Sequence, residues 1–102
     1  MTKLGLLGVA MAAVAAMQPA GADEALALAS GCTVCHQMEA RLVGPSYKEV
    51  AARYKAEPGA GQALAAKVRA GSVGTWGQIP MPANAVVSDA DLAKVIDWIL
   101  TL

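Results

Sequence analysis

Cys32-Thr33-Val34-Cys35-His36 is the most informative segment of this 102-residue sequence. Its C-x-x-C-H pattern is typical of covalent haem attachment. Two thiols at this spacing can bond two carbons on one edge of a porphyrin. The histidine that follows is then carried under the ring, where it can bind the iron. We therefore predict one haem c, attached through Cys32 and Cys35, with His36 as an iron ligand.

Three other uses of this segment have less support. A thioredoxin-like dithiol is expected within an α/β pattern, and no run of the sequence alternates with the period of a strand. A disulfide between Cys32 and Cys35 would close a very small loop and add little stability. A tetrahedral zinc site needs more ligands than the two cysteines and one histidine of this chain.

Residues 1–22 are predicted to be a cleaved secretory signal peptide. Lys3 supplies the positive charge, and an apolar run follows at 4–16. The small residues that a signal peptidase accepts lie at 20–22. The apolar run is shorter than the roughly 20 residues of a membrane-spanning helix, so an uncleaved anchor is the weaker alternative. We expect a periplasmic protein without stable membrane insertion, and a single domain over 23–102.

The composition of that domain limits its partners and its core. From residue 23 onward there are seven Lys or Arg and eight Asp or Glu. Nucleic-acid binding needs a basic excess, so no nucleic acid is expected. The chain has no Phe, two Tyr and two Trp. A domain of about 80 residues with so few large apolar side chains needs a cofactor or another cross-link to build a stable core.

Helix signals predict an all-α fold. A short helix is expected at 23–30, and a second after a capping box formed by Ser46 and Glu49. A third is expected at about 60–70. The last begins at Ser88 and carries a buried stripe with helical spacing, namely Leu92, Val95, Ile96 and Ile99.

The second iron ligand is inferred by elimination. After signal cleavage only Met38 and Met81 remain as methionines, and His36 is the sole histidine. Met38 lies too close to His36 in sequence to reach the opposite face of the ring. Met81 lies between two prolines that stiffen a long Gly/Pro-rich loop at 71–85. We predict Met81 as the ligand, with a space-filling methionine as the alternative. Two occupied axial positions disfavour oxygen chemistry and favour electron transfer.

These segments resemble the small class I bacterial cytochromes c, in particular the short type first known from pseudomonads. The resemblance covers 23–102 and also rests on Val43-Gly44-Pro45-Ser46-Tyr47 and on Gly74-Thr75-Trp76-Gly77-Gln78-Ile79-Pro80-Met81-Pro82-Ala83-Asn84. It implies a class I cytochrome c fold, with about four helices wrapped around one haem. It also implies a monomeric electron carrier and not an enzyme.

The resemblance further implies roles for single residues. The Pro45 carbonyl is expected to accept the Nδ1 proton of His36. The Trp76 indole is expected to bind a haem propionate, assisted by Lys67, with plain packing as the alternative for Trp76. The Asn84 amide is expected to support the methionine sulfur.

The last expectations concern the contact between the first and the last helix. Trp98 is interpreted as a packing residue where the last helix crosses the first. Related chains usually have an aromatic residue on the first helix at this contact, whereas this chain has Ala27. We therefore expect Leu26 or Leu28 to fill it.

The predicted function is electron transport in respiration or photosynthesis, towards a terminal reductase, an oxidase or a reaction centre. Larger redox proteins are expected to dock transiently at the exposed haem edge. The rim of that edge is predicted to consist of Leu42, Val43, Ile79, Pro80, Pro82 and Ala83. One alternative is a bound cytochrome subunit of a periplasmic dehydrogenase or sulfur-oxidising complex. Another is a gas sensor in which Met81 leaves the iron.

Overall fold

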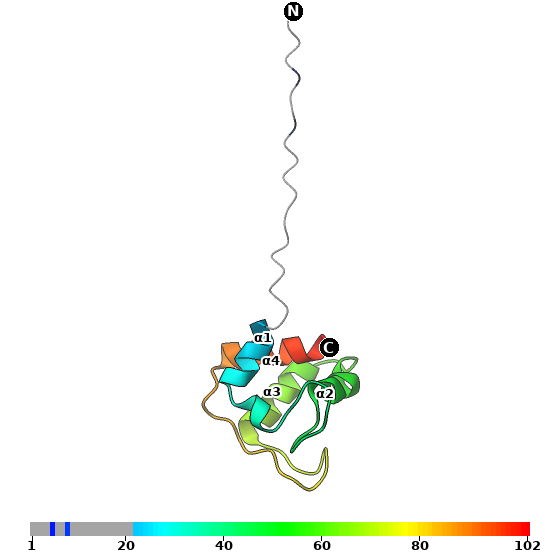
Figure 1. Ribbon diagram of the computed structural model, residues 1–102, viewed down its shortest axis with the longest axis vertical. Coiled ribbons are helices and arrows are strands. Elements are labelled where there is room, and N and C mark those ends of the chain that lie inside the picture. The colour runs from blue at the N-terminus through cyan, green and yellow to red at the C-terminus, as the bar shows by residue number, and fades with distance from the viewer. Residues whose placement is uncertain (1–4, 6–7, 9–21) are drawn as a thin grey trace, which may run out of the picture.

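The computed structural model describes Gly5, Gly8 and residues 22–102. In that part the chain forms a short 3-10 helix, η1 (Cys32–Val34), and the helices α1 (Ala22–Ala29), α2 (Tyr47–Tyr54), α3 (Ala60–Ala70) and α4 (Asp89–Leu100). The same part contains no β-strand, only two isolated antiparallel bridges. The all-α prediction is therefore confirmed (Figure 1).

The predicted signal peptide falls almost wholly outside the described residues, so its assignment stays a prediction. Among the helices that are described, none has the length and apolar character needed to cross a bilayer.

Helix α4 is the centre of the fold, because it contacts α1, α2 and α3. Leu92, Val95 and Ile96 form its buried face, as the helical spacing predicted, whereas Ile99, the fourth residue of the predicted stripe, is only partly buried. The Ser88 side chain accepts a hydrogen bond from the Asp91 backbone N–H, which caps the start of the helix. Figure 1 shows α1 and α4 side by side at one end of the molecule.

Helix α2 begins at the predicted capping box. The Ser46 hydroxyl accepts from the Glu49 backbone N–H at 3.1 Å, and the Glu49 carboxylate accepts from the Ser46 backbone N–H at 2.8 Å. Both donors would otherwise lack partners at a helix start. The helix buries Tyr47, Ala51 and Tyr54. The box therefore fixes the backbone next to Pro45, where the chain enters the helix.

The α1–α4 contact differs in detail from the expectation. Ala27 itself fills it, with no exposed surface, and packs against Tyr47 and Val95. Leu26 is partly buried against this cluster, whereas Leu28 is 64% exposed and takes no part. A small side chain lets α1 approach closely, so no large residue is needed. Trp98 packs against the same cluster, in agreement with its interpretation as a packing residue.

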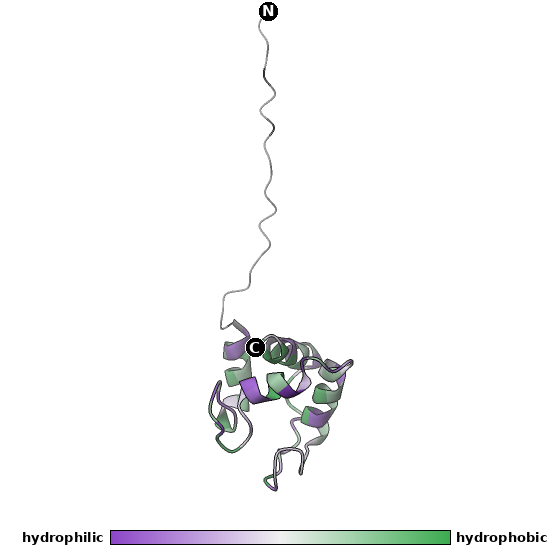
Figure 2. Cartoon of the chain, turned by 90° about the vertical axis from the view of Figure 1, so that its right-hand side faces the viewer, coloured by the Kyte–Doolittle hydropathy of each residue, from purple (hydrophilic) through white to green (hydrophobic). Residues whose placement is uncertain are grey.

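Two long loops connect the helices at the end of the molecule opposite the start of α1 (Figure 1). Each loop contains both hydrophilic and hydrophobic residues (Figure 2), and the Arg41 side chain of the first loop reaches the Trp76 backbone in the second. The second loop turns back at Gly71, whose φ is +77°. A Cβ at this position would lie 2.8 Å from the Met81 carbonyl oxygen. Glycine therefore allows the loop to return against the end of α3.

Candidate functional site

A cavity lies between the helices and the two loops. It has a volume of about 130 Å³ and is partly open to solvent. Aliphatic side chains of α2, α3 and α4 form much of the wall. Most predicted site residues also line it, namely Cys32, His36, Pro45, Lys67, Trp76, Met81 and Asn84.

The His36 ring is oriented by backbone on both sides. Its Nδ1 donates a hydrogen bond to the Pro45 carbonyl oxygen at 2.7 Å. The carbonyl can only accept, so Nδ1 carries the proton and Nε2 keeps a lone pair for a metal. A Cβ on Gly44 would lie 2.6 Å from Cε1 of the ring, so only glycine admits the imidazole here. The Pro45 contact that the resemblance implied is present.

Cys32 and Cys35 are joined by the single turn of η1. The Cys35 and His36 backbone N–H groups both donate to the Cys32 carbonyl, at 3.2 and 3.0 Å. Both thiols are free and partly buried, so the two sulfurs are not joined. Burial raises the pKa of the Cys32 thiol, and a backbone hydrogen bond partly opposes this. Cys35 does not line the cavity but lies directly before His36.

Tyr47 forms the wall behind the histidine. Its ring is stacked on the His36 ring, with the centroids 5.8 Å apart. Its buried hydroxyl has no hydrogen-bond partner among the described residues. Burial, followed by the negative charges of a Cys32 thiolate and Glu24, raises the pKa of Tyr47 to about 12. A neutral hydroxyl without a partner at the cavity wall is consistent with a cavity shaped for a bound group.

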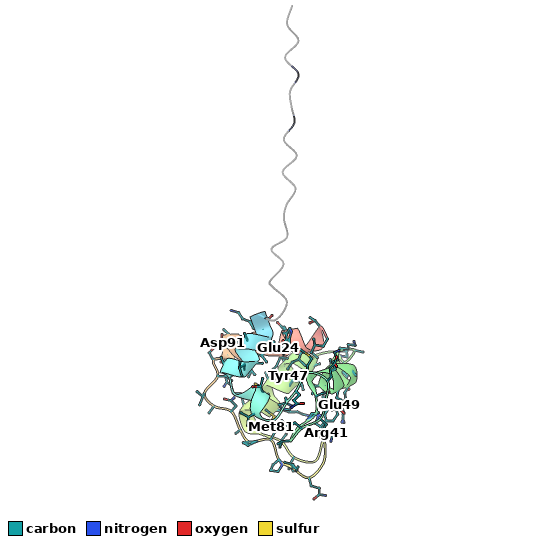
Figure 3. The ribbon with its side chains drawn as sticks, in the orientation of Figure 1. Glu24, Arg41, Tyr47, Glu49, Met81 and Asp91 are labelled. Carbon is teal, nitrogen blue, oxygen red and sulfur yellow. The ribbon has the colours of Figure 1, made fainter. Side chains whose placement is uncertain are left out.

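Met81 approaches the cavity from the second loop (Figure 3). Its backbone N–H and carbonyl exchange two hydrogen bonds with Ser72, of 2.8 and 3.1 Å. This pairing fixes the backbone that carries the thioether. Met38, in contrast, packs against the cluster around Ala27 and does not line the cavity. Of these two methionines only Met81 lines the cavity, and its role as an iron ligand stays a prediction.

Lys67 and Trp76 line one side of the cavity together with Tyr54. The Lys67 ammonium donates to the Tyr54 hydroxyl at 3.3 Å and lies 5.4 Å from the centre of that ring. This is the side on which the resemblance places the haem propionates. An ammonium and an indole N–H at a cavity wall suit an anionic group.

Asn84 ties the second loop to α1. Its Nδ2 donates to the Ser30 carbonyl at 3.3 Å, and its Oδ1 accepts from the Val86 and Val87 backbone N–H groups. Its own backbone N–H donates to the Val68 carbonyl. Backbone groups thus fix the Asn84 side-chain amide, and one of its two Nδ2 protons remains available for a further hydrogen bond. Its predicted contact with the Met81 sulfur stays a prediction.

Several site residues escaped the sequence analysis. The contact of Gly44 with His36 depends on how the loop folds back, through a hydrogen bond from the Gly44 N–H to the Cys35 carbonyl. Arg41 reaches the backbone of Trp76, 35 positions away, and Arg53 reaches that of Thr75. No helical or strand periodicity reports contacts over such separations. Of these contacts, only that of Gly44 with His36 had a signal in the sequence, namely the glycine next to Pro45.

The residues present fit haem c. The Cys32 thiol, an imidazole nitrogen freed for a metal and a thioether line one largely apolar cavity, and the Cys35 thiol lies on the same turn as Cys32. The described residues hold no cluster of three or more His, Cys, Asp or Glu that would favour a different metal site.

Comparison with known proteins gives the same result. The model of the cytochrome c family matches residues 22–102. Cytochrome c-551 of Allochromatium vinosum is 52% identical over 94 residues, which cover 92% of this chain and 100% of the relative. Cytochrome c-551 of Pseudomonas aeruginosa is 45% identical over 71 residues, covering 70% of this chain and 67% of the relative.

A solved structure is also similar. The crystal structure of Nitrosomonas europaea cytochrome c552 superposes with a TM-score of 0.75 at 51% identity, covering 78% of this chain and 98% of the other. The family match spans most of the chain, and the cysteine pair stands in the haem-attachment pattern within it. The chain therefore belongs to the cytochrome c family, as a small class I c-type cytochrome that carries one covalently bound haem c and serves electron transfer, not catalysis.

Proposed function

We propose that the protein is a periplasmic one-electron carrier in which His36 and Met81 would bind the haem iron. It passes electrons to a larger redox protein such as a terminal reductase, an oxidase or a photosynthetic reaction centre. The observation that carries this proposal is that His36 and Met81, from two different loops, line one apolar cavity.

The haem would supply a one-electron redox couple, and residues of the chain would attach it and orient its ligands. Cys32 and Cys35 form the thioether links, and the Pro45 carbonyl keeps the His36 ring in one orientation. A thioether ligand favours the ferrous state and so raises the reduction potential. Neither ligand has to leave or change its protonation between the two states. An iron bound by both His36 and Met81 would suit outer-sphere electron transfer.

The predicted docking rim is exposed. Leu42, Val43 and Ile79 are 49%, 48% and 67% exposed, and Pro80, Pro82 and Ala83 are exposed as well. Leu42 and Val43 directly precede Gly44, which contacts His36, and Ile79 lines the cavity. An uncharged rim next to the cofactor suits the small, brief contacts of redox encounters. We propose that a monomer docks through this rim.

Rapid mixing with an oxidised partner from the same periplasm tests the proposal. Ile79→Asp should lower the second-order rate constant about tenfold at equal driving force, because a buried charge at a small interface costs more than about 1.4 kcal/mol. The reduction potential of each variant is measured as well, so that the driving force of each reaction is known. Val86→Asp is the matched control, since Val86 is 95% exposed and does not line the cavity. Equal rates for both variants would contradict docking through this rim.

Two other outcomes would redirect the functional assignment. Stable copurification with a larger chain would identify a bound subunit of a dehydrogenase or sulfur-oxidising complex. Carbon monoxide binding by the native ferrous protein near neutral pH would indicate a sensor whose methionine leaves the iron.

A further inference from the structure

Two arginines from separate segments meet at the loop that carries Trp76. Arg41, in the loop before α2, donates through Nη1 to the Trp76 carbonyl oxygen at 3.2 Å. Arg53, on α2, donates through Nη1 to the Thr75 carbonyl oxygen at 3.1 Å. Their guanidinium carbons lie 5.8 and 4.9 Å from the centre of the Trp76 ring. Both distances are within the roughly 6 Å range of cation–π attraction.

Arg41 is itself anchored to α2. Its Nε lies 3.8 Å from the Glu49 carboxylate oxygen that also accepts the Ser46 backbone N–H of the capping box. Arg41 and Glu49 lie near each other in Figure 3. The arginine pair therefore connects three parts of the chain: the first loop, the start of α2 and the second loop.

Positive charge gathers on this side of the cavity. The Arg53 guanidinium carbon lies 5.6 Å from the Tyr54 ring centre, and Lys67 donates to the hydroxyl of the same tyrosine. Arg41, Arg53 and Lys67 thus lie around Trp76 and Tyr54, and among the described residues Glu49 is the only carboxylate paired with any of them. An excess of cations beside a cavity favours an anionic ligand group there.

We propose that Arg41 and Arg53 are positioning residues that clamp Trp76 in the cavity wall and supply fixed positive charge beside the carboxylate side chains of the bound haem. The proposal rests on the haem-binding function proposed above. A guanidinium is suited to this task because it can stack on the indole face and donate in its own plane to the backbone carbonyl. A lysine would keep the charge but lose the planar stacking.

Because lysine keeps the charge but cannot stack in the same way, arginine-to-lysine variants test the positioning of Trp76 separately from the electrostatic effect. Hydrogen exchange of the Trp76 indole N–H in the haem-bearing protein, followed by NMR, reports the clamp. In the Arg41→Lys/Arg53→Lys double variant we expect exchange about tenfold faster than in the wild type, the factor that corresponds to about 1.4 kcal/mol. The Trp98 indole packs on the Ala27 cluster and is the internal reference, with unchanged exchange.

The reduction potential reports the charge. Positive charge near the iron favours the ferrous form, so Arg53→Gln should have a lower potential than the wild type, and Arg53→Lys should stay close to it. Lys55→Gln is the matched control, because it removes the same charge from the end of the same helix, where the ammonium reaches the Leu102 carbonyl. We expect its potential to change less than that of Arg53→Gln.

The possible failures can be told apart. Unchanged Trp76 exchange in the double lysine variant would overturn the clamp. Equal potentials for Arg53→Gln and Lys55→Gln would overturn the charge assignment while the haem-binding function still stands. A wild-type chain that attaches no haem in a competent host would overturn the proposed function together with this inference.

Discussion

Met81 has the most specific proposed role among the single residues of the cavity wall. Ser72 fixes its backbone through two hydrogen bonds, and its side chain reaches the same cavity as His36. Met38 differs, because it packs into the α1–α4 cluster. The two methionines of the described domain therefore form a natural pair for comparison.

Replacing each methionine with leucine tests the ligand assignment. Met81→Leu should open the sixth position of the iron, lower the reduction potential and abolish the charge-transfer band of methionine-bound ferric haem. Met38→Leu should keep both properties, because a volume-conserving swap in a core costs less than about 1.5 kcal/mol. Potentiometric titration and optical spectra of the two variants check this. Loss of the band in Met38→Leu instead would reverse the assignment.

Gly44 provides a second test at a single residue, namely of the close approach between the backbone and the His36 ring. Gly44→Ala would place a methyl group 2.6 Å from Cε1 of His36, so the ring or the loop must shift. We expect the free energy of unfolding to fall by about 1–3 kcal/mol, as in other overpacked sites. Gly61→Ala is the control, because a Cβ there meets nothing within 4 Å and lies in a helix. It should be neutral or stabilising by up to about 1 kcal/mol.

Denaturant unfolding of haem-bearing Gly44→Ala and Gly61→Ala, with a comparison of their m-values, measures both changes in the free energy of unfolding. If Gly44→Ala proved as stable as the wild type, the imidazole would not be held against the backbone at this position.

At the scale of the helices, local sequence signals were sufficient where the determining contacts are local. The capping box of Ser46 and Glu49 and the apolar stripe of α4 depend on residues within one or two turns, and both were predicted correctly. The close α1–α4 contact at Ala27 was not predicted, because it depends on how near two helices approach. That distance is set by packing in three dimensions and leaves no periodic signal in the sequence.

The Ala27 contact leads to a prediction about helix packing. Ala27→Phe should lower the free energy of unfolding by about 1–3 kcal/mol, because Ala27 has no exposed surface and the added ring has no room beside Tyr47 and Val95. Leu28→Phe, one position further along at a side chain that is 64% exposed, should change it by less than about 0.5 kcal/mol. Thermal unfolding of the two variants measures the difference. Equal stability would mean that the helices can separate to admit an aromatic residue.

For the whole molecule, the helix pattern predicted the all-α fold, and the haem-attachment segment together with the family resemblance predicted site residues that mostly line the cavity. What they could not predict is how the two loops meet. Arg41 and Trp76 lie 35 positions apart, and their contact follows only after the helices have packed. The same is true of the Asn84 amide, which bonds to the Ser30 carbonyl at the end of α1. Such contacts depend on the complete fold.

The domain is also expected to depend on its cofactor as a whole. A cavity lined by aliphatic side chains of α2, α3 and α4 interrupts the protein core of a short chain. Domains of about 70–80 residues rarely gain more than about 3–5 kcal/mol from such a core alone. We expect the haem-free wild-type chain, produced with both thiols reduced, to show much less helix by circular dichroism and no cooperative unfolding. Helix content equal to that of the haem-bearing form would contradict this.

The optical spectrum of the oxidised protein at neutral pH, after export in a host that attaches haem, tests most directly whether His36 and Met81 enclose a thioether-linked haem. We predict a covalent low-spin c-type spectrum with the methionine-to-iron charge-transfer band. A high-spin spectrum without that band, or a colourless folded protein with Cys32 and Cys35 joined in a disulfide, would contradict this account.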